Sequence, residues 1–212
     1  MTRFGSLIFC ATLGAGLLAC GSNGDSTATK NALDLVLLDN AVSGWTIDVG
    51  SNKSGTAQPT TGTTAKEVEG LIDGAASAYF TAPYTPEIFV WQNYINTTLP
   101  AAPLPDGAHL KLYILQMPSA DQASGLYTTL LQFGDWQRKL GTPDDWKPTS
   151  PLVGTESRIQ DTTTQWWVNF HQDVFYVEVL LDPSAPAPDY TPSNPDLKDE
   201  TVRFAREVAK KM

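Results

Sequence analysis

Apolar residues recur at helical spacing in three stretches of the chain. The first stretch follows Thr64-Ala65-Lys66-Glu67, which has the residue types of a capping box, and it predicts a helix from Ala65 to Phe80. The second follows the similar sequence Ser119-Ala120-Asp121-Gln122, and its apolar stripe continues to Leu131. The third begins at Asn194-Pro195, residues typical of an N-cap and a first helical position.

Runs of β-branched and aromatic residues predict the strands. They lie at 87–95 and 109–117, in a short segment at 156–160, and in two long segments at 165–171 and 174–181. The last two are separated by so few residues that an antiparallel hairpin is expected. Because helices and strands do not alternate regularly, we expect an α+β fold, in which one antiparallel sheet has its helices packed on one face.

Alternation within the last two strands gives the predicted sheet two unlike faces. Phe175, Val177 and Val179 alternate with Tyr176 and Glu178, and the preceding strand alternates similarly. If the apolar set faces the core, the other face carries aromatic and polar groups that could hold a sugar or a peptide. The candidate ligand-binding residues are Trp167, Asn169, Tyr176 and Glu178, with Lys111 and Tyr113 from another strand. A mixed sheet face covered by the closing helix would give the same pattern without any ligand.

The N-terminus has the layout of an export signal. Arg3 is followed by apolar and small residues from Leu7 to Ala19, a stretch shorter than the roughly 20 residues that span a bilayer. It ends at Leu17-Leu18-Ala19-Cys20-Gly21, which resembles the lipobox of bacterial lipoproteins. That resemblance implies cleavage before Cys20 and lipidation, including palmitate-like acyl chains, on that residue. The alternative is an ordinary secretory signal in which the cysteine occurs by chance.

These features predict three segments. Residues 1–19 are expected to be a lipoprotein signal peptide, 20–32 a flexible tether, and 33–212 one globular α+β domain. Two or three acyl chains would hold the protein firmly, because each buried CH₂ contributes about 0.8 kcal/mol. We therefore expect a cell-envelope protein anchored in the membrane by its N-terminal lipid. Gly21 after the cysteine implies the outer membrane, on its periplasmic or surface face, if the sorting code of well-studied envelopes applies.

Charge and cysteine content narrow the chemistry. The net charge of −9 becomes −10 once Arg3 is removed, so the domain is repelled by phosphate backbones and nucleic acid is not an expected partner. Cys10 leaves with the signal and Cys20 is capped, so the mature domain has no disulfide and no cysteine-based site. Signatures such as G-x-S-x-G and H-E-x-x-H are missing from the sequence, and we expect no cofactor, no metal site and no assigned catalytic residue.

Two segments together resemble an uncharacterised bacterial family, many of whose members are lipoproteins. They are Val68–Tyr79, with the pattern Ile-Asp-Gly-Ala-Ala-x-x-Tyr, and Leu112–Tyr127, in which a strand ends in a methionine and leads to an Ala-x-Gly-x-Tyr helix. The family has no known reaction, so the resemblance implies no catalytic residue. Gly74 and Gly125 stand inside predicted helices, where glycine costs about 1 kcal/mol, and close packing is the expected compensation.

Three functions remain open from the sequence. The first is a non-catalytic module that binds a small polar ligand or an envelope protein. The second is an envelope hydrolase or transferase that uses carboxylates such as Glu178, and the third is a structural spacer. An open and concave second sheet face would favour the first two, and a covered or flat one would remove support from the second.

Overall fold

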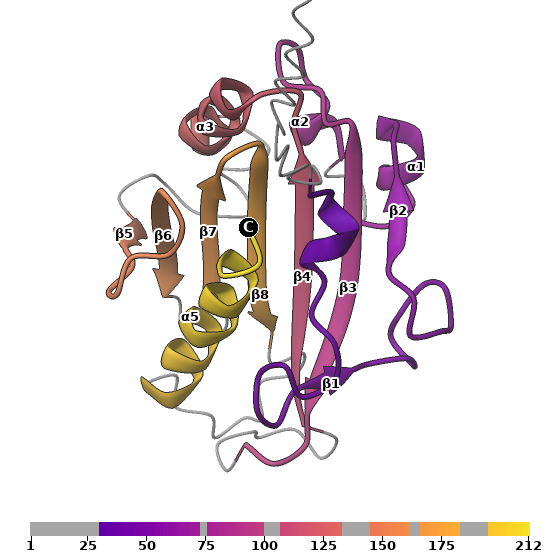
Figure 1. The fold of residues 1–212 in the computed structure, drawn as a ribbon, viewed down its shortest axis with the longest axis vertical. Helices are drawn as coiled ribbons and strands as arrows, with labels where there is room; N and C mark the ends of the chain where they lie inside the picture. The colour runs from indigo at the N-terminus through magenta and orange to yellow at the C-terminus, as the bar shows by residue number, and fades with distance from the viewer. Residues whose placement is uncertain (1–29, 73–75, 100–106, 133–144, 162–165, 183–194) are drawn as a thin grey trace, which may run out of the picture.

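The computed structural model describes residues 30–72, 76–99, 107–132, 145–161, 166–182 and 195–212. Within them one antiparallel sheet has the strand order β1-β3-β4-β8-β7-β6-β5, with β2 paired to β3 (Figure 1). The strands are β1 (Thr46–Ile47), β2 (Thr60–Gly62), β3 (Ile88–Asn96), β4 (Ala108–Gln116), β5 (Trp146–Pro148), β6 (Glu156–Asp161), β7 (Trp166–Gln172) and β8 (Phe175–Asp182). The helical segments are η1 (Ala32–Leu35), α1 (Ala65–Glu69), α2 (Ala76–Tyr79), α3 (Ala120–Thr129), η2 (Leu130–Gln132) and α5 (Pro195–Ala209).

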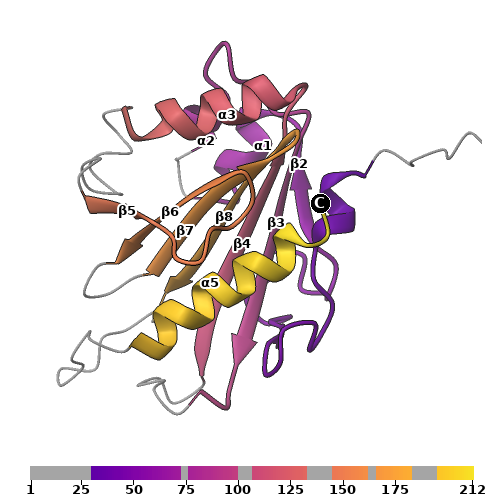
Figure 2. The ribbon, with the colours of Figure 1, turned by 60° about the vertical axis from the view of Figure 1, so that its left-hand side comes forward.

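The expected α+β class and antiparallel sheet are confirmed. The helices, however, cover both faces of the sheet and not one (Figure 2). On one face, α5 contacts β7 and β8, and its Phe204 belongs to the same core cluster as Val168, Val177 and Val179. On the other, α3 contacts the same two strands and buries Leu126 among the aromatic residues there. The amphipathic stripes in the sequence show that each helix needs a partner, but they do not say which face provides it.

The long strands agree with the sequence pattern. β3 and β4 begin and end within one residue of the expected 87–95 and 109–117, and the hairpin of β7 and β8 turns at Asp173, whose φ of +50° is left-handed. Asp tolerates this region better than most residues because its short side chain bonds locally. The alternation is also confirmed, because Phe175, Val177 and Val179 belong to one core cluster and Tyr176 to the other.

The single helix expected over 65–80 is a wrong prediction. Two short helices stand there, α1 and α2, and the chain leaves α1 at Gly70. The capping box that begins α1 is confirmed, because the Thr64 hydroxyl accepts from Glu67 N and the Glu67 carboxylate accepts from Thr64 N. Gly70 has the lowest helix propensity after proline, and the apolar residues beyond it keep their spacing without continuing the helix. Asp73 and Gly74 lie outside the described residues.

The short strands β2 and β5 stand in segments whose composition predicts loops, Thr/Gly/Ser-rich over 51–64 and Pro/Asp-rich over 141–151. Both lie at the outside of the sheet, β2 beside β3 and β5 beside β6. Edge strands need few apolar residues, because one side of each ladder and much of each face meets solvent. Composition therefore gave no strand signal for 60–62 or 146–148.

Close packing at Gly125 is confirmed. A Cβ at this position would lie 2.6 Å from Cε1 and 3.0 Å from the hydroxyl oxygen of Tyr84. The glycine in α3 therefore admits an aromatic ring that any other residue would push away. This contact holds α3 against the segment that precedes β3.

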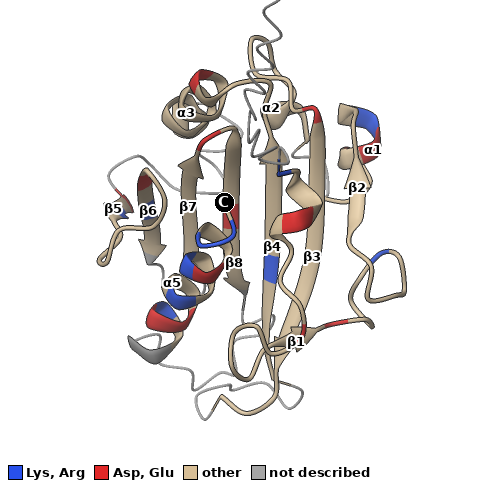
Figure 3. Cartoon of the chain, in the orientation of Figure 1, with Lys and Arg blue, Asp and Glu red and all other residues tan. Residues whose placement is uncertain are grey.

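The C-terminal helix is tied to the N-terminal segment. Trp45 Nε1 donates to the Glu200 carboxylate at 3.0 Å, and Lys30 Nζ donates to the carbonyl of Met212 at 2.7 Å. Acidic and basic residues lie close together along α5, while the central strands carry few charges (Figure 3).

Among the described residues, no helix has both the length and the apolar character needed to cross a membrane.

Candidate functional site

Polar side chains form one row across four neighbouring strands of the sheet. Tyr113 on β4 lies opposite Glu178 on β8, Glu178 opposite Asn169 on β7, and Asn169 opposite Arg158 on β6. Directly paired residues of antiparallel strands project from the same face. The row therefore lies on the face covered by α3, and it ends at Arg158 near the β5 edge.

A connected set of hydrogen bonds is built on this row. Asn169 Nδ2 donates to the Tyr176 hydroxyl at 3.0 Å, and the Tyr176 hydroxyl donates to Glu178 Oε1 at 2.7 Å. Trp167 Nε1 donates to the other carboxylate oxygen, Oε2, at 3.1 Å. We call Glu178, Tyr176, Asn169, Trp167 and the adjacent Tyr79 the Glu178 cluster.

Burial changes the acidity of this cluster. Burial, the largest effect, raises the pKa of Glu178 to about 7, while hydrogen bonds from Tyr176 and Tyr79 and the charge of Arg158 oppose that rise. Burial also raises the pKa of both Tyr176 and Tyr79 well above the usual value, and the nearby Glu178 charge raises it further. Glu178 can therefore exchange a proton near neutral pH, while the tyrosines stay protonated and donate.

The structure places the six candidate ligand-binding residues on one sheet face, as their alternation predicts. It brings Trp167, Asn169, Tyr176 and Glu178 into direct contact, and Tyr113 lies across the strand from Glu178. Lys111 lies one step further along β4, opposite Leu180. The residues of the Glu178 cluster are buried, with Asn169, Tyr176 and Glu178 each 0% exposed, so this part of the face is covered and is not an open floor.

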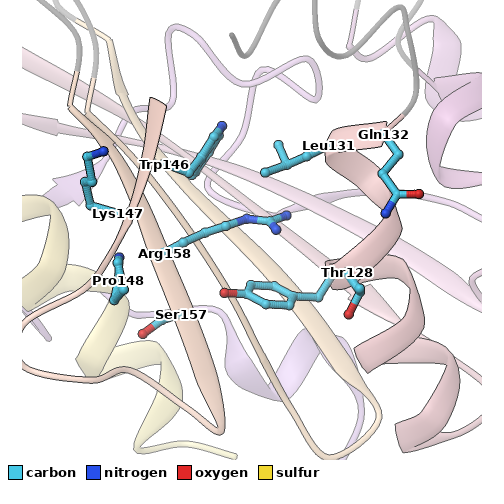
Figure 4. Close-up of a pocket in the computed structure, with 9 residues that line it drawn as sticks. Thr128, Leu131, Gln132, Trp146, Lys147, Pro148, Ser157 and Arg158 are labelled. Carbon is cyan, nitrogen blue, oxygen red and sulfur yellow. The ribbon is translucent and has the colours of Figure 1, made fainter. Parts of the chain in front are cut away.

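An open cleft lies beside the cluster, where α3 and η2 face β5 and β6 (Figure 4). Its volume is about 320 Å³, close to the lower end of the range for small-molecule sites. It is lined by Tyr127, Thr128, Leu131, Gln132, Trp146, Lys147, Pro148, Ser157 and Arg158, and we call it the Arg158 cleft. Figure 4 shows Arg158 reaching from its strand toward Leu131 and Gln132, with Lys147 directed away from it.

Two aromatic rings lie against the Arg158 guanidinium. Its central carbon is 4.2 Å from the centroid of the Tyr127 ring and 5.3 Å from that of the Trp146 ring. Such cation–π contacts orient the guanidinium plane and leave its edge to donate hydrogen bonds. Within the described part of the chain, however, Nε and Nη2 of Arg158 are buried without a hydrogen-bond partner.

Two further polar atoms near Arg158 share this property. Asn169 Oδ1 and His171 Nε2 are buried, and neither has a hydrogen-bond partner among the described residues. The His171 ring lies 5.1 Å from the Tyr127 ring, and burial lowers the pKa of His171 despite the charge of Glu156 at 3.9 Å. An unpartnered buried polar atom costs about 1–3 kcal/mol of stability. The end of the polar row next to the Arg158 cleft therefore carries a free-energy cost that a hydrogen-bond partner would remove.

Sequence reasoning missed Arg158, Tyr127 and Trp146. The sequence could have placed Arg158, because it alternates with Ser157 and Ile159 in a predicted strand. Ile159 packs in the opposite core cluster, so Arg158 belongs to the other face of the sheet. Tyr127 was recognised only as a core residue of a helix, and Trp146 stood in an expected loop. What brings the three together is the strand order β7-β6-β5, which no local pattern contains.

Among the described residues, no three His, Cys, Asp or Glu side chains gather closely enough to hold a metal ion. Cys20, the expected lipidation site, lies outside the described residues. Comparisons with protein-family models, with curated proteins and with solved structures gave no significant match to this chain.

Proposed function

We propose that this chain is a lipid-anchored protein of the bacterial cell envelope whose domain binds a small polar ligand in the Arg158 cleft without transforming it. The lipobox-like sequence ending at Cys20 supports the anchor. The observation that carries the ligand site is Arg158 itself, a cation that lines an open cleft, lies against two aromatic rings and has two buried donors without partners.

The charge balance supports a negatively charged or strongly polar ligand. Arg158 lies in a protein with a net charge of −9, and no carboxylate lines the cleft within the described chain. The apolar part of the lining, Tyr127, Leu131, Trp146 and Pro148, would contact the carbon skeleton of the ligand. A few placed polar groups on an apolar wall are the usual composition of a small-molecule site.

Glu178 supports this function from behind the cleft. It does not line the cleft and is fully buried, so the structure gives no support to the alternative of a hydrolase or transferase in which Glu178 touches the substrate. Its charge acts on Arg158 through space, and its hydrogen bonds fix Tyr176 and Trp167. In our proposal Glu178 is a positioning residue.

The anchor is tested by mass spectrometry of the protein purified from a bacterial envelope. We expect a processed N-terminus at Cys20 that carries diacylglyceryl and acyl mass, and we expect Cys20→Ser to leave the membrane fraction. An uncut leader or an unmodified thiol would refute the anchor.

The binding site is tested by thermal unfolding of the processed, detergent-solubilised protein against envelope sugars, peptides and organic acids. We expect at least one class to raise the melting temperature of the wild type and of Arg206→Gln, a change at an exposed arginine on α5. The same ligand should leave Arg158→Gln unchanged. If no ligand class shifts the wild type, the binding proposal fails.

A further inference from the structure

We propose that the ligand of the Arg158 cleft carries a carboxylate, and that the side-on edge of Arg158, Nε with Nη2, is the group that binds it. The inference rests on the proposed binding function and adds the chemical class of the ligand. Its starting point is that these two atoms are the pair left without partners. In a guanidinium they lie on one edge and point their hydrogens in parallel, which matches the two oxygens of a carboxylate.

The rings decide between acceptor shapes. The centroids of the Tyr127 and Trp146 rings lie 4.2 Å and 5.3 Å from the guanidinium carbon. We infer that an acceptor lying near the guanidinium plane avoids these rings best. A carboxylate is planar and meets this condition with both oxygens. A phosphate or sulfate is tetrahedral, so its remaining oxygens would project toward the aromatic rings and lose water there without gaining a donor.

The neighbouring atoms add a second requirement. Asn169, directly opposite Arg158, does not line the cleft itself, but its buried Oδ1 has no donor within the described chain and lies behind the Arg158 edge that the ligand would reach. A ligand with a hydroxyl or ammonium group next to its carboxylate would satisfy this acceptor. The class with both groups comprises hydroxy acids, sugar acids and amino acids.

Access requires a small movement. Nε and Nη2 are buried in the cleft wall, and Trp146 covers the guanidinium from β5, a strand of three residues at the sheet edge. Within the described chain β5 pairs with β6 alone, and Trp146 also packs on Trp167, so displacing its ring costs that contact but breaks no second ladder of strand hydrogen bonds. The two hydrogen bonds that a carboxylate accepts from the buried donors compensate for the free-energy cost of moving the Trp146 ring.

The test uses four probes on the processed, detergent-solubilised protein: lactate, glycerol, benzoate and phenyl phosphate. Binding is followed by the Nε–H signal of Arg158 in a ¹⁵N NMR spectrum, assigned with Arg158→Lys. We expect lactate and benzoate to move that signal downfield with saturation, and glycerol to leave it in place. Phenyl phosphate should bind about tenfold or more weakly than benzoate, because its remaining oxygens would lose water against the rings without gaining a donor.

Two variants sharpen the test. Arg158→Lys keeps the charge but removes the parallel pair of donors, so lactate affinity should fall about tenfold or more, whereas Arg206→Lys should leave it unchanged. Asn169→Leu should weaken lactate relative to benzoate, which has no hydroxyl. Equal binding of phenyl phosphate, full binding by Arg158→Lys, or an unmoved Nε–H signal would overturn the carboxylate assignment. The broader ligand screen would still stand or fall by itself, because it does not depend on this probe set.

Discussion

The Tyr176 hydroxyl donates to Glu178 Oε1 at 2.7 Å although both side chains are 0% exposed. Two residues of one strand thus share a hydrogen bond beneath α3, and Asn169 from the adjacent strand donates to the same hydroxyl at 3.0 Å. A carboxyl group held this way must be neutral, or be compensated, in a place that water does not reach. Its protonation is therefore linked to the stability of the fold.

Glu178→Gln should flatten the pH dependence of stability between about pH 4.5 and 7. The folded-state pKa is raised from 4.5 to about 7, so folding favours the protonated acid. That contribution is complete below pH 4.5 and is lost as the pH rises through 7, a change on the order of 3 kcal/mol. Glutamine cannot titrate, so urea unfolding of the variant across this range should lack the loss.

The matched control is Glu69→Gln, which changes an exposed carboxylate on α1. It should keep the wild-type pH profile. Equal profiles for wild type and Glu178→Gln would show that Glu178 does not titrate near neutral pH in the folded protein.

Tyr176→Phe should destabilise the protein by about 1–3 kcal/mol. The change removes the donor to Glu178 and leaves Asn169 Nδ2 without its acceptor, and both losses are buried. Combining it with Glu178→Gln in a double-mutant cycle, measured by chemical unfolding, should give a coupling energy of about 1 kcal/mol or more. Additive effects of the two changes would contradict a direct bond between the two side chains.

The sequence predicts the long strands well because their signal is local. Alternation with a period of two residues fixes which side chains share a face, so Trp167, Asn169, Tyr176 and Glu178 can be grouped from the sequence alone. Their burial could not be predicted in this way. It depends on α3 lying on the same face, and the apolar stripe of that helix would fit either face of the sheet.

The cleft illustrates the same limit. Arg158, Tyr127 and Trp146 come from a short strand, a helix and a strand that looked like a loop, and only the pairing of β5 with β6 brings them together. Gly125 is an intermediate case. Its position inside a helix predicted a close contact, but the identity of Tyr84 as the partner depends on the fold.

Gly125→Ala should destabilise the wild type but stabilise the Tyr84→Ala background. In the wild type the added methyl would lie 2.6 Å from the Tyr84 ring, so the ring or α3 must move. Without the ring, alanine is the better helix former by about 1 kcal/mol. Thermal unfolding of the four proteins measures this reversal of sign, and a stabilising effect in the wild type would show that the contact is not tight.

The claim that the domain holds a small ligand at Arg158 is tested most directly by native mass spectrometry of the whole processed protein, released gently from its own envelope. We predict a stoichiometric small-molecule adduct on the wild type and on Arg206→Gln, and its loss from Arg158→Gln. A wild-type protein without any adduct, or an adduct kept by Arg158→Gln, would contradict the account.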